Sequence, residues 1–298
     1  MMEFLSEILA QDFMLRALTG GALVAIACAM LGVLVFQRGI TFIGDGLAHS
    51  MFGAAGIVAL FNAMIGAAAG SPADSNTGTY GAFFIWAALP LNVLVGFAMA
   101  WVRRTGKLRG DAAIGIFFPI MCAAGVLCLA LRRNSGAPPL NMEALLFGSV
   151  LGMTPADLII MAGGAVSIAV IALTWGRRIA YAAFDADLAA MSGVRVALAE
   201  YALFGLCAAV VAFSMRLAGV VLVSSLLAIP AGAASLWRGS YGWQLLFASV
   251  FAATSVKIGL ILAYWIDVPS GAMIVLTMGA LFFVVMVVRA FVVPNAKR

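Results

Sequence analysis

Long apolar runs separated by short polar intervals dominate the pattern of this chain. Each long run is about the length that an α-helix needs to cross the hydrocarbon core of a bilayer. The runs cover residues 17–36, 38–62, 82–102, 112–131, 155–175, 196–215, 218–236, 243–265 and 270–293. One more apolar stretch, 145–151, is too short to span and is expected to lie at the interface or to re-enter. The pattern predicts an all-α polytopic membrane protein with eight or nine transmembrane helices, forming a single transmembrane domain over residues 1–298.

Composition supports this prediction and excludes several other classes. The chain is 65% hydrophobic and only 10% charged, with a mean hydropathy of +1.13. Soluble domains do not have this composition, whereas membrane spans do. The net charge of +5 is explained by basic loops beside anionic lipid, so a nucleic-acid partner is not expected. The four cysteines lie in apolar runs without a Cys-x-x-Cys pair, which indicates packing residues and not a disulfide framework or a zinc site.

The distribution of basic residues predicts how the spans are oriented. Lysine and arginine gather in the intervals 103–109 and 176–195, whereas the interval 70–81 has none. The positive-inside rule therefore places the first two intervals in the cytoplasm, and the third interval and the amino terminus outside. Lys257 is an exception, because it is expected to be buried within the eighth run. It either takes part in a cation-repelling gate, pairs with a carboxylate on another helix, or extends its stem toward an interface.

Two ionisable residues lie near the start of the second apolar run. Asp45 and His49 are four positions apart, so a helix places them on one face, and His49 is the only histidine in the chain. Ionisable side chains within membrane spans usually face a pathway, a cavity or a partner. A carboxylate and an imidazole together suit a divalent cation such as zinc or manganese. The alternative is a buried hydrogen bond between the two side chains that serves only the structure.

The polar interval 176–195 has the features of a short amphipathic helix between two spans. Asp185 lies near the expected amino-terminal end of this helix, and Gly193 is placed to terminate it. These signals by themselves fit either a solvated connector or an element that docks a cytoplasmic partner.

The segment 45–49, Asp-Gly-Leu-Ala-His, resembles the Asp-Ala-Leu-Ser-His signature of the zinc, manganese and iron permease family of ABC importers. Two residues depart from that signature, Gly46 in place of alanine and Ala48 in place of serine. Four further segments resemble motifs of the same family, in the same order along the chain: 110–116, Gly-Asp-Ala-Ala-Ile-Gly-Ile; 146–151, Leu-Phe-Gly-Ser-Val-Leu; 222–231, Leu-Val-Ser-Ser-Leu-Leu-Ala-Ile-Pro-Ala; and 267–272, Asp-Val-Pro-Ser-Gly-Ala. Because the matches extend over nearly the full length, the resemblance is specific.

The resemblance implies a homodimeric permease of a bacterial inner membrane, with a fold like that of type II ABC importers. Such a permease receives zinc, manganese or iron from an extracytoplasmic metal-binding protein and is driven by a separate cytoplasmic ATPase. It implies that Asp45 and His49 contact the transported metal, with no cofactor permanently bound. It also implies that Phe184, Asp185 and Gly193 belong to the segment that couples to the ATPase. The chain has no Gly-x4-Gly-Lys-Ser/Thr loop, so it is not expected to hydrolyse ATP or to be an enzyme.

Three other functions remain open on the sequence. Asp45 and His49 would also serve as a proton relay in an ion-coupled secondary transporter, which needs no ATPase. ABC permeases for siderophores or cobalamin have similar spans but carry bulky metal chelates. An integral-membrane enzyme that uses the pair as acid and base is disfavoured, because one histidine without a nucleophile motif gives it little chemistry.

If Asp45 and His49 bind a metal ion, these two ligands are too few to close the site, so water, carbonyl groups or a second protomer must complete it.

Overall fold

The computed structural model is all-helical over the residues it describes, which are 11–68, 77–106, 108, 111–134, 155–184, 186–237 and 239–292. The helices, in chain order, are α2 (Asp12–Gln37), α3 (Ile43–Ala68), α4 (Thr77–Thr105), α5 (Ala112–Asn134), α7 (Pro155–Thr174), α8 (Gly176–Phe184), α9 (Ala186–Met191), α10 (Val196–Ser235), α11 (Tyr241–Ile266) and α12 (Ser270–Val292). The stretch 145–151, expected at the interface, lies outside the described residues, and so does Asp185.

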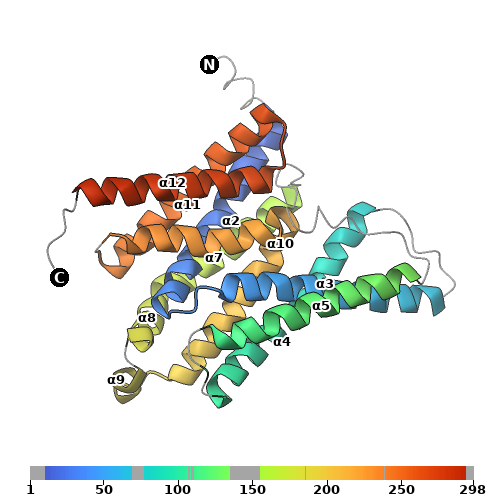
Figure 1. Ribbon diagram of the computed structural model, residues 1–298, viewed down its shortest axis with the longest axis horizontal. Coiled ribbons are helices and arrows are strands. Elements are labelled where there is room, and N and C mark those ends of the chain that lie inside the picture. Colours follow the sequence, from blue (N-terminus) through green and yellow to red (C-terminus); the bar gives the residue numbers. More distant parts are fainter. Residues whose placement is uncertain are drawn as a thin grey trace.

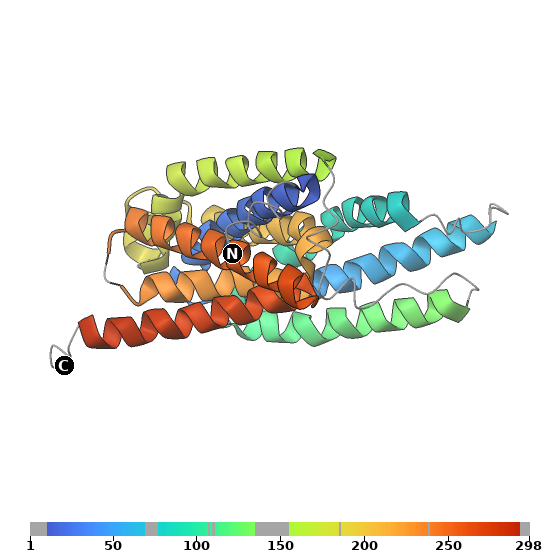
Figure 2. The ribbon, with the colours of Figure 1, turned by 90° about the horizontal axis from the view of Figure 1, so that it is seen from above.

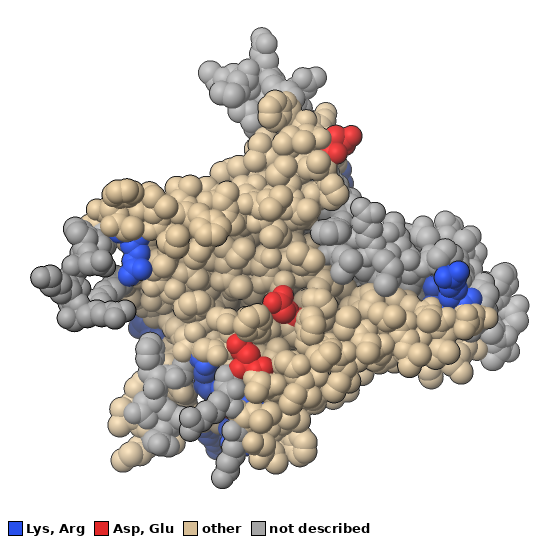
Figure 3. All heavy atoms as spheres, viewed as in Figure 1, with Lys and Arg blue, Asp and Glu red and all other residues tan. Residues whose placement is uncertain are grey.

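Eight segments of the described residues are long and apolar enough to cross a membrane. They confirm the predicted polytopic architecture. In addition, the 29-residue α4 connects α3 to α5, which lie side by side in Figures 1 and 2. On the face shown in Figure 3, uncharged side chains cover most of the surface and charged groups form a few separate patches. Such a surface suits hydrocarbon, where charged groups are costly.

The α10 region contains the two spans that the pattern predicts at 196–215 and 218–236. Its arms, Val196–Met215 and Ala218–Ser235, are each long enough to span. Gly219 joins them with φ +71° and ψ +168°, a conformation that L side chains rarely adopt, so the chain turns sharply there (Figure 1). A glycine at this position therefore lets two spans follow each other with almost no loop.

Helix α2 lies at the centre of the fold and packs against α7, α8, α10 and α11. Its apolar side chains are buried on nearly all sides, because small residues allow neighbouring backbones to approach. At Gly32, for example, an added Cβ would overlap the backbone carbonyl of Leu227 on α10. Small-residue packing of this kind is how membrane helices associate when lipid removes the hydrophobic driving force between them.

The expectation that Lys257 is buried is wrong. Lys257 lies on α11 but is exposed, whereas its neighbour Val256 and the residue Ala252 face the bundle. Consecutive helix positions are rotated by about 100°, so the buried stripe of α11 passes beside Lys257 without including it. The long aliphatic stem therefore lies on the outer surface of the bundle, from where it can extend its ammonium group toward an interface.

Candidate metal pathway

The structure places Asp45 and His49 in the first two turns of α3, on one face and half-buried, as the spacing predicts. The His49 Nδ1 atom lies 2.9 Å from the backbone carbonyl oxygen of Asp45. A carbonyl oxygen can only accept, so this hydrogen bond places the ring proton on Nδ1. In the neutral ring, the lone pair of Nε2 is then free to bind a cation. Metal-binding histidines are commonly fixed in this way by a second hydrogen bond from the other ring nitrogen.

The two side chains do not form the structural hydrogen bond that was the alternative interpretation. His49 bonds to the main chain of its own helix, and the Asp45 carboxylate has no hydrogen bond among the described residues. The His49 ring instead packs against Phe118 of α5, with ring centroids 4.3 Å apart. The pair therefore offers one carboxylate and one imidazole nitrogen on a partly open face.

The described side chains do not bring a third ligand to this pair. No group of three or more His, Cys, Asp or Glu side chains that would hold a metal ion occurs among the described residues. A weakly held ion suits transport, because a transported ion must leave its site as readily as it enters. The geometry thus fits a transient station along a pathway better than a structural metal centre, which would be closed by four ligands.

Close packing of α3 against α5 sets the position of the pair. A Cβ added at Gly46 would overlap Cγ2 of Ile114, and one added at Gly53 would overlap the backbone carbonyl of Met121. A Cβ added at Gly125 of α5 would likewise overlap the ring of Phe52. Gly46, which differs from the family signature, is therefore explained by helix packing, and the Ile114 side chain occupies the space that an alanine methyl would take.

Gly46→Ala should destabilise the protein by about 1–3 kcal/mol, the usual cost of overpacking. The double variant Gly46→Ala with Ile114→Leu should recover most of this loss, because leucine lacks the Cγ2 branch that meets the new methyl. Thermal unfolding of the detergent-purified chain measures both effects. Gly115→Ala is the matched control, since an added Cβ there meets nothing within 4 Å. An unchanged melting temperature for Gly46→Ala would contradict this account of the packing.

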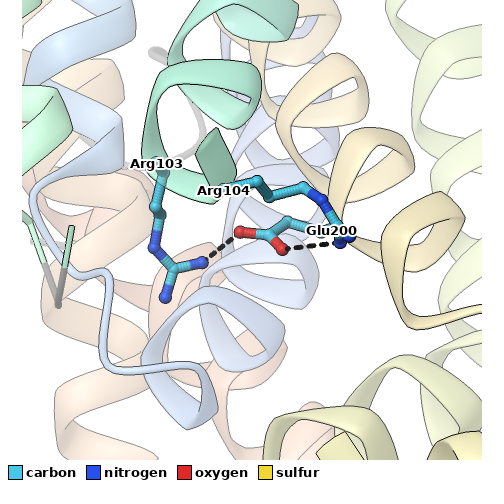
Figure 4. A network of polar contacts seen from close by, with 3 residues as sticks. All are labelled: Arg103, Arg104 and Glu200. Atoms are coloured by element: carbon cyan, nitrogen blue, oxygen red, sulfur yellow. Dashed lines mark hydrogen bonds and ion pairs between the residues drawn. The ribbon is translucent and has the colours of Figure 1, made fainter. Parts of the chain in front are cut away.

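A polar cluster lies where α4 ends and α10 begins (Figure 4). Arg103 Nη1 donates a hydrogen bond to Glu200 Oε1, and Arg104 Nη1 lies 3.6 Å from Glu200 Oε2. The Glu200 side chain is only 9% exposed. Glu200 was not identified from the sequence. The sequence does contain a feature that could have identified it: Glu200 is the sole acidic residue in the run 196–215, and the strongly basic interval 103–109 offers partners for its charge.

Two more charged residues extend this cluster toward the start of α3. Burial lowers the pKa of Arg38, which follows α2; the charge of Glu200 opposes this change and that of Arg103 adds to it. Burial also raises the pKa of Asp111, which precedes α5. A hydrogen bond from the backbone of Phe42 and the charge of Arg103 both act in the opposite direction and lower this pKa. The cluster therefore links the ends of α2, α4, α5 and α10 to the turn from which α3 begins, and Asp45 follows Phe42 by three positions.

The coupling segment predicted at 176–195 forms two helices instead of one. These are α8 and α9, and Phe184 is the last residue of α8. Gly193 follows α9 with φ +80°, and its N–H bonds to the carbonyl of Ala190, so it ends this helix as predicted. At the other end, Gly176 packs against Tyr241, whose hydroxyl donates to the Ala172 carbonyl at 3.0 Å. The segment is therefore fixed to the bundle at its start, and α8 packs against α2, α7 and α10.

Fold and site together define a multi-pass membrane protein that carries a half-buried carboxylate and imidazole on one face of a span. Residues 10–289 match the family model of the ABC 3 transport family, and the chain belongs to this family. It is 29% identical to the manganese transport system membrane protein MntC of Halalkalibacterium halodurans, over 94% of this chain and 88% of that protein. It is 28% identical to the chelated iron transport system membrane protein YfeC of Yersinia pestis, over 92% and 86% of the two chains.

Solved structures confirm the fold. The chain superimposes on a chain of PsaBC from Streptococcus pneumoniae in complex with Fab with a TM-score of 0.75, at 24% identity, covering 98% of this chain and 96% of that one. A second match is an inward-facing conformation of a putative metal-chelate type ABC transporter, with a TM-score of 0.63 at 17% identity, covering 95% and 88% of the two chains. The expectation of an ABC permease fold is confirmed.

Proposed function

We propose that this chain is the membrane permease of an ABC importer that carries a divalent transition metal across a bacterial inner membrane. The observation that carries the proposal is the Asp45–His49 pair. Its imidazole is oriented by the helix backbone, with Nε2 available, and its carboxylate is unpartnered among the described residues. Membership of the ABC 3 transport family supports it, as do relatives named for manganese and chelated iron transport.

Manganese is the proposed cargo, ahead of iron and zinc. Carboxylates, carbonyl groups and water suit manganese, whereas zinc sites are richer in imidazole and thiolate. This chain supplies one histidine, and its Cys28 and Cys207 are buried in the packed bundle. Further ligands are supplied by water, by backbone carbonyls or by a second copy of the chain. The order of preference is tested by measuring uptake of labelled manganese by the reconstituted importer, in competition with iron(II) and zinc. Stronger competition by zinc than by unlabelled manganese would reverse that order.

Transport is driven by a separate ATPase that docks on α8 and α9, on the same side as the end of α2. The chain lacks a phosphate-binding loop of its own. Because Gly176 packs against Tyr241 and α8 packs against α2, α7 and α10, a push on the coupling segment is passed to the bundle. Uptake that requires ATP and the ATPase subunit is expected. Uptake by the chain alone along an ion gradient would instead establish a secondary transporter.

Asp185→Lys should weaken co-purification of the permease with its ATPase subunit by about tenfold, because a reversed charge at a docking surface lowers affinity by a kcal/mol or more. Pull-down of the complex from membranes, at equal permease abundance, measures this. Asp12→Lys is the matched control: it makes the same charge change on an exposed residue at the start of α2, on the opposite side of the membrane. Equal complex yields for the two variants would remove the segment from the docking surface.

The Arg103–Arg104–Glu200 cluster transmits the ATP-driven movement of the coupling segment to the Asp45–His49 pair. Gly193 leads into the first turns of α10, where Glu200 holds the end of α4. Arg103 in turn lies near Asp111, which contacts the backbone of Phe42 just before α3. A rigid shift of α10 is thereby passed to the helix that carries Asp45. Rigid elements with paired charges at their ends are suitable for such coupling.

A further inference from the structure

A cavity of about 490 Å³ opens between α8, the turn after α9 and the first turn of α10. Its polar lining comes from Arg178, Ser192 and Arg195, and its apolar lining includes Trp175, Val194 and Leu198. No acidic residue is among the residues that line it. The cavity is separate from the Asp45–His49 pair and from the Glu200 cluster.

The position of the cavity along the bundle is fixed by the two spans that border it. Trp175 directly follows the span Asp157–Thr174, and Arg195 directly precedes the span Val196–Met215. The cavity thus lies at the level where the helices leave the hydrocarbon core and enter the headgroup layer. Trp175 and Leu198 are each 51% exposed. A half-exposed tryptophan at the end of a span is typical of the membrane interface.

The cavity is also electrostatically suited to an anion. Arg178 and Arg195 are exposed, and the ion pairs of the described side chains involve Glu200 with Arg103 and Arg104 and neither of these two residues. Helix α10 begins at this cavity, and the Arg195 side chain at its N-cap does not cap the first turn. Two arginines and the positive end of a long helix therefore face the same space.

We propose that this cavity binds the phosphate headgroup of an anionic phospholipid from the cytoplasmic leaflet. Basic pockets between spans on this side of a membrane recognise such headgroups, and the anionic leaflet keeps them at high local concentration. The apolar wall formed by Ile179, Val194 and Leu198 accommodates the lipid's glycerol and upper acyl carbons. The bound lipid bridges Arg178 of α8 and Arg195 of α10, so it holds the turn at Gly193 and the adjoining α9 in place.

The test uses the full-length chain in nanodiscs made from equal amounts of phosphatidylglycerol and phosphatidylcholine. Native mass spectrometry counts the molecules of each lipid that remain bound after release. Arg178→Gln combined with Arg195→Gln should reduce retained phosphatidylglycerol by about tenfold relative to phosphatidylcholine, in line with the contribution of basic residues to anionic lipid binding. The matched control is Arg177→Gln with Arg289→Gln, which removes the same charge from cytoplasmic positions outside the cavity and should retain the lipid.

Ser192→Glu is an independent variant that leaves both arginines in place. It adds a negative charge inside the cavity and should cause the same selective loss, which keeps the test decisive if the double arginine variant does not fold. Equal loss in the cavity and control variants, or no loss in either, would overturn the proposal. Displacement of phosphatidylglycerol by excess inorganic phosphate would assign the cavity to soluble anions instead, and its expulsion by the bound ATPase would assign it to the protein interface.

Discussion

Asp45→Asn and His49→Ala should each reduce manganese uptake by more than about tenfold while leaving the protein abundant in the membrane. Even the residues that support metal ligands contribute on the order of 10–100-fold to metal affinity, so removing a ligand should cost at least as much. Asparagine keeps the shape of Asp45 but removes the charge that neutralises the cation, and alanine removes the only imidazole of the chain. Uptake per folded transporter, in proteoliposomes containing the complete importer, is the measurement.

Ser50→Ala is the matched control for this prediction. Ser50 follows His49 but is buried, and its hydroxyl donates to the Gly46 carbonyl of its own helix, so it is not a proposed ligand. Near-normal uptake is expected for this variant. If the Asp45–His49 pair had only a structural role, its variants would instead lose about 1–3 kcal/mol of stability and appear as reduced protein. Wild-type uptake by both substituted transporters would end the metal-pathway interpretation.

Glu200→Gln should uncouple ATP hydrolysis from metal uptake and destabilise the fold by roughly 1–3 kcal/mol, between the effects of exposed and buried ion pairs. It leaves the partly buried Arg103, whose side chain is 18% exposed, without its charged partner. The measurement is the ratio of metal ions imported to ATP molecules hydrolysed. It should fall in the variant even after correction for the amount of folded complex.

A charge exchange separates coupling from simple misfolding. Arg103→Glu combined with Glu200→Arg restores an opposite pair between α4 and α10 and should recover much of the lost ratio, as in a double-mutant cycle. Arg104→Gln provides a milder comparison, since this side chain is 40% exposed and its nitrogen lies 3.6 Å from the carboxylate. If the exchanged pair recovered stability without recovering the ratio, the cluster would be structural only.

The coupling segment shows which structural features can be predicted from a few neighbouring residues and which cannot. Gly193 ends a short helix as predicted, because a positive φ after a helix is a property of a few consecutive residues. The division of the segment into α8 and α9 did not follow from the same signals. The packing of Gly176, at the start of α8, against Tyr241, 65 positions further along the chain, did not follow from them either.

The sequence by itself determined the membrane class, the spans and the common face of Asp45 and His49. Hydropathy is a sum over neighbouring residues, and a helix fixes where positions four apart must lie. Only the tertiary structure decided that Nδ1 of His49 bonds to a backbone carbonyl, that Ile114 fills the space beside Gly46, that Lys257 lies outside the bundle and that Glu200 joins α10 to α4. Most of these features depend on contacts between helices distant in the chain, and the rotation of each helix is set by its neighbours. Spacing along one segment carries no information about that rotation.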